Sequence, residues 1–351
     1  MKQIIEDFIP MGGRHCITNS LKQIFYYYGH PISEAMIFGI ASGISFAYIN
    51  LENSPMVSGR TKPFVFEEKL AEQLGIKIKC RKPKDYVNAV KKMKCMLDDK
   101  NPVLIYADMP YMSYLNLNKD NHFGGHAIVV FGYDDEKHCF YVSDRDNHDF
   151  SIRTPRGDIS EDYHLVDYAE MEAARNSSYR PFPANNKFLE FDFENIHDNK
   201  KNLITSECIV SAIKDSCSSM LNPPAQLLGI TGIKKFEHEV LKWKNFDDDK
   251  LKIAGITNYF QINQDGGTGG GIFRKLYGEF LIEAESLYNE LPLKEIGKSF
   301  IEVSKKWDLI ADDMWKLGES GERHMLSKIS KQIGSIYDFE SSLYKQLEER
   351  I

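Results

Sequence analysis

The sequence pattern of this chain changes near residue 195, and this change constrains its fold more than any other feature. Before it, short runs dense in Val, Ile, Phe and Tyr alternate with polar turns, which is typical of β-strands. These runs occupy residues 102–108, 124–135, 139–146 and 150–155. After residues 178–195, whose prolines and asparagines indicate a connection, apolar residues recur at helical spacing. We therefore predict an α+β domain at residues 1–195 and an all-α domain at residues 196–351.

Composition is typical of an ordinary folded protein. With 351 residues, 42% of them hydrophobic, the chain is long enough to bury two cores. The six cysteines form no CxxC pair, so we expect free thiols. A net charge of −7 with only short basic runs argues against a nucleic-acid partner. The first residues lack the basic head and apolar stretch of a secretory signal, which favours a cytoplasmic location.

Residues 33–49 are apolar, with Gly39 and Gly43 four positions apart. Polar residues interrupt the segment and it is short for a membrane span, so we predict a tightly packed core helix and no membrane partner. The sequence leaves the oligomeric state open, with a homodimer among the options.

Cys16 precedes an amphipathic segment that ends at Gly29. Its apolar residues follow one stripe of a helix: Ile17, Leu21, Ile24, Phe25 and Tyr28. Cys16 therefore falls in the first helical turn, where the helix dipole lowers a thiol pKa and backbone amides can hold an oxyanion. The alternative is a buried structural cysteine, since Cys is among the most often buried residue types.

A second segment, "HFGGHAIVVFGYDDEKHCFYVSDRD", predicts a β-hairpin that carries His126 and Asp144. The midpoint of these two positions is residue 135, inside the polar turn, so an antiparallel hairpin places them opposite each other on one face. The carboxylate would then orient the imidazole as the base for a thiol. Asp146 has the same parity and is the second choice. Singly, His126 could be a core histidine and Asp144 a turn-capping acid.

Cys, His and Asp in this order match the chain order of papain-like folds. The hairpin resembles that of bacteriocin-leader-processing peptidases, and a closer resemblance covers nearly the whole chain. Residues 15–49 resemble the start of the butirosin biosynthesis protein H family, in which a His-Cys pair opens a helix and a Ser-Glu-Ala stretch follows. Residues 265–284 resemble the helical domain of unknown function that often follows it.

This resemblance implies a papain-like cysteine peptidase fold used for acyl transfer. Cys16 would take an acyl group from the phosphopantetheine thioester of an acyl carrier protein and pass it to a primary amine, such as an aminoglycoside or a diamine, in antibiotic biosynthesis. His126 would serve as the base and Asp144 as its orienter. Apart from the phosphopantetheine arm of the donor, no cofactor is implied, and no His/Cys cluster has metal-ligand spacing.

The oxyanion hole departs from the papain-like pattern. Those hydrolases usually place a glutamine several residues before the cysteine, and "EDFIPMGGRH" contains none. We therefore expect the backbone N–H of Cys16 to serve, helped by Asn19 or His15.

The glycine-rich stretch "DGGTGGG" precedes a predicted helix in the second domain. Gly269, Gly270, Arg274 and Tyr277 are candidates for substrate binding, because a loop at a helix N-terminus suits a phosphate and an arginine can bind an acidic group. A mobile loop that shapes the substrate pocket is an equal alternative, and a plain helix start with a salt-bridged arginine is the simplest one. We predict that this domain contributes to the pocket.

Three function classes follow from these residues. The favoured one is an amide-forming acyltransferase dependent on a carrier protein. The alternative is a papain-like cysteine peptidase or amidase, and the third is a binding protein that kept the fold. Exclusion of water separates the first two, because a transferase must let an amine outcompete water at the acyl-enzyme.

Overall fold

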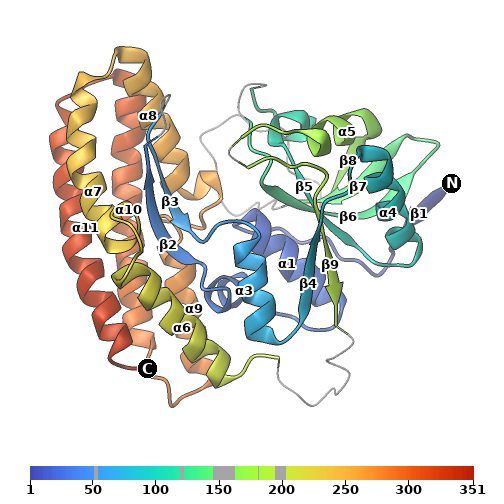
Figure 1. The fold of residues 1–351 in the computed structure, drawn as a ribbon, viewed down its shortest axis with the longest axis horizontal. Coiled ribbons are helices and arrows are strands. Elements are labelled where there is room, and N and C mark those ends of the chain that lie inside the picture. The colour runs from blue at the N-terminus through green and yellow to red at the C-terminus, as the bar shows by residue number, and fades with distance from the viewer. Residues whose placement is uncertain (51–53, 119–121, 145–162, 181, 194–202) are drawn as a thin grey trace. The chain divides into compact units, whose positions relative to one another are not determined.

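A computed structural model describes residues 1–50, 54–118, 122–144, 163–180, 182–193 and 203–351 (Figure 1). The chain forms two compact units. Unit 1 comprises residues 1–37 and 75–203, and unit 2 comprises residues 38–74 and 204–351. The structure therefore differs from the single predicted boundary near residue 195, because residues 38–74 belong with the helical part of the chain.

Unit 1 is built on an antiparallel sheet of seven strands among its described residues. Their order is β4-β9-β5-β6-β7-β8, and β1 pairs with the C-terminal end of β6. The strands are β1 (Lys2–Ile4), β4 (Lys77–Arg81), β5 (Val103–Ala107), β6 (His126–Asp134), β7 (Cys139–Ser143), β8 (His164–Asp167) and β9 (Phe188–Asp192). Every residue of β5, β6 and β7 is buried, which agrees with their dense apolar runs. The strand predicted at residues 150–155 lies outside the described residues.

Among the described residues, three α-helices lie wholly within unit 1: α1 (Cys16–Tyr27), α4 (Tyr86–Asp98) and α5 (Tyr168–Asn176). The predicted helix that begins at Cys16 is confirmed as α1, and Gly29 follows it with a positive φ of 80°. The buried face of α1 packs against β6 and β5, which brings the N-terminal helix onto the hairpin strands.

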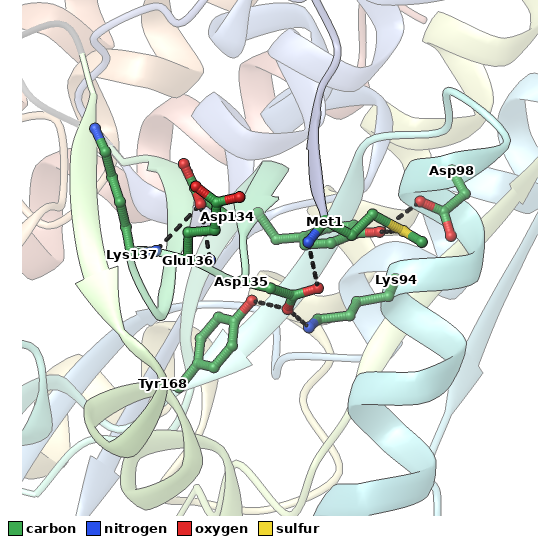
Figure 2. A network of polar contacts seen from close by, with 9 residues as sticks. Met1, Lys94, Asp98, Asp134, Asp135, Glu136, Lys137 and Tyr168 are labelled. Carbon is green, nitrogen blue, oxygen red and sulfur yellow. Dashed lines mark hydrogen bonds and ion pairs between the residues drawn. The ribbon is translucent and has the colours of Figure 1, made fainter.

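The turn between β6 and β7 is tied to both other helices of unit 1 (Figure 2). Asp135 in this turn accepts hydrogen bonds from Lys94 Nζ on α4 at 2.5 Å and from Tyr168 Oη on α5 at 2.8 Å. The hydrogen bond from Lys94 is the main reason that the pKa of Asp135 falls to about 2. The polar turn predicted between the strands is thus a fixed anchor of the hairpin.

Unit 2 combines helices with one β-hairpin. Its helices are α3 (Val65–Leu74), α6 (Ser206–Leu221), α7 (Gly229–Val240), α8 (Asp248–Ile262), α9 (Arg274–Leu287), α10 (Lys294–Ser320) and α11 (Met325–Glu348). The helical prediction for residues 196–351 is confirmed for the described part of that range, residues 203–351. Within the described ranges, no helix of the protein is both long enough and apolar enough to cross a membrane. All six cysteines are free, as expected.

The single core helix predicted at residues 33–49 is wrong. The structure instead has α2 (Glu34–Ile40) and then strand β2 (Ile44–Ile49), which pairs with β3 (Met56–Arg60). Further partners of this hairpin come from residues much later in the chain: Val57 N–H donates to Asn258 Oδ1 on α8 at 3.0 Å, and Tyr48 N–H donates to Leu227 O, just before α7, at 2.8 Å. These non-local partners explain why sequence pattern alone assigned the segment to the wrong element and the wrong unit.

Candidate active site

His126 and Asp144 form a buried pair at one end of the β6–β7 hairpin. His126 is the first residue of β6, and Asp144 follows the last residue of β7. His126 Nε2 lies 2.7 Å from Asp144 Oδ2, and each residue is 2% exposed. The predicted contact between these side chains is confirmed by this distance.

The backbone register of the hairpin differs from the prediction. Asp134 still belongs to β6 and pairs with Cys139, so the turn is centred later in the chain than residue 135. Val129 pairs with Ser143, and residues 126 and 144 are therefore not directly opposite. They meet as a diagonal pair, which long side chains on one face can bridge. Asp146, the second choice, lies outside the described residues.

Cys16 is the first residue of α1 and interacts with the ring of His126. Burial of His126 opposes its protonation, but the charge and hydrogen bond of Asp144, together with the interaction with Cys16, outweigh it. The pKa of His126 consequently rises to about 9. A buried imidazole between a carboxylate and a thiol is the arrangement that activates a cysteine nucleophile.

The buried polar face of α1 holds the helix against the hairpin. Asn19 Nδ2 donates to the backbone oxygen of Asp144 at 3.0 Å, and Ser20 Oγ donates to Ala127 O at 3.1 Å. Ser143 Oγ donates to Gln23 Oε1 at 2.6 Å. The helix that carries Cys16 is thus bonded to Asp144 itself and to Ala127 and Ser143, the strand residues next to His126 and Asp144.

Tyr114 is a further residue of the site. Its hydroxyl donates to Asp144 Oδ2 at 2.8 Å, and its ring stacks on His164 with centroids 3.9 Å apart. Tyr114 lies in a short 3-10 helix, Ser113–Leu115, and its sequence context contains no motif. Sequence reasoning missed Tyr114, and also missed Ser20 and Gln23 of α1, because Asn19 was the only polar residue of that helix considered for the site.

Two family models match the chain. Residues 15–145 match the model described as butirosin biosynthesis protein H, N-terminal, and residues 169–347 match a domain of unknown function, DUF4872. The chain belongs to the family that joins these two domains. Cys16, His126 and Asp144 all lie within the first match. No curated protein matches the chain.

Membership of this family indicates an enzyme related to antibiotic biosynthesis. The resemblance predicted from the His-Cys pair and the glycine-rich stretch is therefore confirmed for both domains.

Within the butirosin-H-type domain, two of the predicted oxyanion donors have other partners. Both amide hydrogens of Asn19 are used, on Asp144 O at 3.0 Å and on Met11 O at 2.9 Å. The backbone N–H of His15 donates to Glu34 Oε2 at 3.1 Å, and its Nδ1 lies 3.3 Å from Thr18 Oγ1. Asn19 therefore positions Asp144 and does not serve as an oxyanion donor in this structure.

Arg274, in the region of the second family match, is not available for a substrate. The residue is fully buried, and its Nε and Nη2 each donate to the carboxylate of Glu340 at 2.9 Å. Its Nη1 donates to Ser45 O and Ile272 O, both at 3.0 Å. The predicted role in binding a phosphate or an acidic group is replaced by a structural ion pair inside unit 2.

The other candidates near Arg274 are also part of a packed core. The Tyr277 side chain is fully buried, and its burial raises the pKa of its hydroxyl well above the usual value. Gly269 and Gly270 both have positive φ, and a Cβ on Gly269 would lie 2.8 Å from Leu276. Glycine is therefore required at these positions by backbone conformation and, at Gly269, by close packing, and both residues are buried within unit 2.

A second histidine–aspartate pair, His122 with Asp108, lies close to the start of β6. Asp108 is fully buried, and its carboxylate accepts hydrogen bonds from Phe123 N–H at 2.7 Å and from the Ser177 hydroxyl. His122 Nδ1 lies 2.8 Å from Asp108 Oδ2. These bonds hold the loop that leads into β6. Among the described residues, no group of three or more His, Cys, Asp and Glu is arranged to hold a metal ion.

Proposed function

We propose that this protein is a cysteine-dependent acyltransferase of antibiotic biosynthesis, with a papain-like catalytic domain. Cys16 is the nucleophile, His126 the general base and acid, and Asp144 the group that orients the imidazole. The observation that carries the proposal is the buried His126–Asp144 pair at 2.7 Å, whose ring also interacts with Cys16 at the start of α1. Family membership supports a biosynthetic role.

The first half-reaction is a thioester exchange. The Cys16 thiolate adds to the carbonyl carbon of an acyl group carried on the phosphopantetheine thiol of a carrier protein. The carbon–sulfur bond to pantetheine then breaks, and the pantetheine thiolate takes the proton held by His126. The acyl group is now a thioester of Cys16, and no external energy source is needed because one thioester replaces another.

The second half-reaction forms an amide. A primary amine adds to the acyl carbon of the Cys16 thioester, and His126 accepts a proton from the attacking nitrogen. The carbon–sulfur bond to Cys16 breaks and regenerates the thiolate–imidazolium pair. Conversion of a thioester to an amide is downhill, so the product is released without ATP.

The test is intact-protein mass spectrometry of the full chain after mixing with an acyl N-acetylcysteamine thioester, a small mimic of the pantetheine end. We expect one acyl adduct on Cys16, and its transfer to an added primary diamine. Cys16→Ser should show no thiol-bound adduct. Cys80→Ser is the matched control, because Cys80 is an exposed thiol on β4 and should be dispensable. Hydrolysis of peptides without amine acylation would instead support a peptidase.

A further inference from the structure

We propose that Glu34 is a positioning residue for Cys16. This inference rests on the proposed function, because it takes Cys16 as the nucleophile. Glu34 is the first residue of α2 and is buried at 6% exposure. It belongs to the Ser-Glu-Ala stretch of the sequence, to which no role has been assigned above.

Both oxygens of the Glu34 carboxylate bind the turn that leads into α1. Oε1 accepts the backbone N–H of Arg14 at 2.9 Å, and Oε2 accepts the backbone N–H of His15 at 3.1 Å. Oε2 also accepts the Thr18 hydroxyl at 2.7 Å. The carboxylate therefore holds the two residues directly before Cys16 and one residue in the same helical turn.

The start of α1 needs such support because its own cap is incomplete. His15 occupies the N-cap position but makes no side-chain capping hydrogen bond. By contrast, α4, α5 and α8 are each capped by the aspartate that precedes them. Before α1, the Glu34 carboxylate instead binds the backbone N–H groups of Arg14 and His15, so the conformation of the two residues that lead into Cys16 depends on Glu34.

The action of Glu34 is geometric, and its charge opposes the chemistry. A carboxylate close to Cys16 disfavours the thiolate by Coulomb repulsion. Its benefit must therefore come from fixing the backbone that directs Cys16 toward His126, since a displacement of about 1 Å at a nucleophile costs about 10²-fold in rate. When Glu34 is replaced, the loss of its charge should therefore favour the Cys16 thiolate, whereas the loss of its backbone contacts should slow acyl transfer.

Glu34→Gln removes the charge and sets an NH2 group against backbone donors. We expect the pH profile of Cys16 alkylation by iodoacetamide, followed by peptide mapping, to move to lower pH. Acyl transfer from the thioester mimic should fall about 10²-fold. Glu34→Asp keeps the charge but shortens the reach, so acyl transfer should fall while the alkylation profile stays in place.

Glu67→Gln is the matched control. Glu67 is also a buried glutamate whose carboxylate accepts a backbone N–H, that of Phe64 at the start of α3, but it belongs to unit 2. This variant should retain the wild-type rate and alkylation profile. Circular dichroism and thermal melting should show that all three variants are folded.

Wild-type acyl transfer in folded Glu34→Gln would overturn the proposal, and so would loss of folding in both Glu34 variants, which would assign the residue to stability alone. A wild-type protein that transfers no acyl group would refute the proposed function instead. The alkylation profile would still report the effect of Glu34 on Cys16, because alkylation requires no acyl substrate.

Discussion

Each of the two units contains a buried ion pair. The two pairs differ in whether the cationic side chain can still take part in proton transfer. In unit 2, each nitrogen of Arg274 is bonded to Glu340 or to a carbonyl oxygen. In unit 1, His126 gives one ring nitrogen to Asp144, and its ring also interacts with Cys16. A guanidinium keeps its proton throughout the pH range in which proteins fold, whereas the imidazole of His126, with a pKa of about 9, can release and regain one. The Arg274–Glu340 pair therefore only connects elements of unit 2, while the His126–Asp144 pair holds a proton that can be transferred.

The largest expected effect is loss of chemistry from the unit 1 pair. Cys16→Ala should lower acyl transfer by at least about 10³-fold with little change in thermal stability. His126→Ala should be equally damaging, and the double variant no worse, because residues that act as one unit are not additive. Steady-state turnover with the thioester mimic measures this. Near-normal turnover in Cys16→Ala would show that Cys16 is not the nucleophile.

In the unit 2 pair we expect loss of stability instead. Arg274→Met leaves Glu340 buried without its partner and should reduce the free energy of unfolding by about 3–5 kcal/mol. Urea denaturation at 25 °C checks this. In the double variant Arg274→Met, Glu340→Met much of the stability should return, since no charge is left unpaired. If Arg274→Met melted like the wild type but lost substrate binding, the structural assignment would be wrong.

Asp144→Asn should have an intermediate effect. The amide keeps the shape of the site but loses the charge that stabilises the imidazolium, so turnover should fall by roughly 10²-fold. Tyr114→Phe, which removes one hydrogen bond to Asp144, should cost about tenfold at most. The order of these two variants is the informative result. A larger loss in Tyr114→Phe would indicate that Tyr114 contacts the substrate.

The pH dependence of stability should separate the two pairs. Because the folded pKa of His126 is raised to about 9 from its ordinary 6.5, its protonated form stabilises the fold fully below pH 6.5. That contribution is lost as the pH rises through 9. The difference in unfolding free energy between the wild type and His126→Gln should therefore shrink from pH 6 to pH 10. The corresponding difference for the double variant Arg274→Met, Glu340→Met, which leaves no titratable group at that pair, should stay constant over this range.

The smallest effect is expected at the Asp135–Lys94 pair in the hairpin turn. This pair is more exposed, so it gives a reference for the loss of stability at the two buried pairs. Side-chain exposure is 38% for Asp135 and 24% for Lys94, so solvent screens their interaction. Asp135→Asn should destabilise the protein by about 1 kcal/mol or less, as measured by urea denaturation. A loss comparable to that of Arg274→Met would mean that the anchored turn contributes much more than an ordinary surface ion pair.

Local pattern was sufficient to predict α1, the β6–β7 hairpin and the contact between His126 and Asp144. The apolar stripe after Cys16 predicted α1, and the polar turn predicted the hairpin that carries His126 and Asp144. The prediction failed where long-range contacts decide. The partners of Arg274, Asn19 and Tyr114 are distant in sequence, and no spacing rule reveals them. The β2–β3 hairpin was misassigned for the same reason, because the helices that cover it begin more than a hundred residues later.

The interleaving of the two units has a consequence for synthesis on the ribosome. The β2–β3 hairpin and α3 leave the ribosome before α6 to α11, which complete unit 2. At about 5–20 residues per second, their partners follow after roughly 10 s. During that interval the strands of unit 1 are synthesised, while apolar residues of the segment 38–74, such as Phe46 and Val57, remain exposed although they are buried in the complete protein. Nascent chains halted near residue 200 should therefore bind chaperones at residues 38–74, and release from the chaperone should coincide with the appearance of the C-terminal helices.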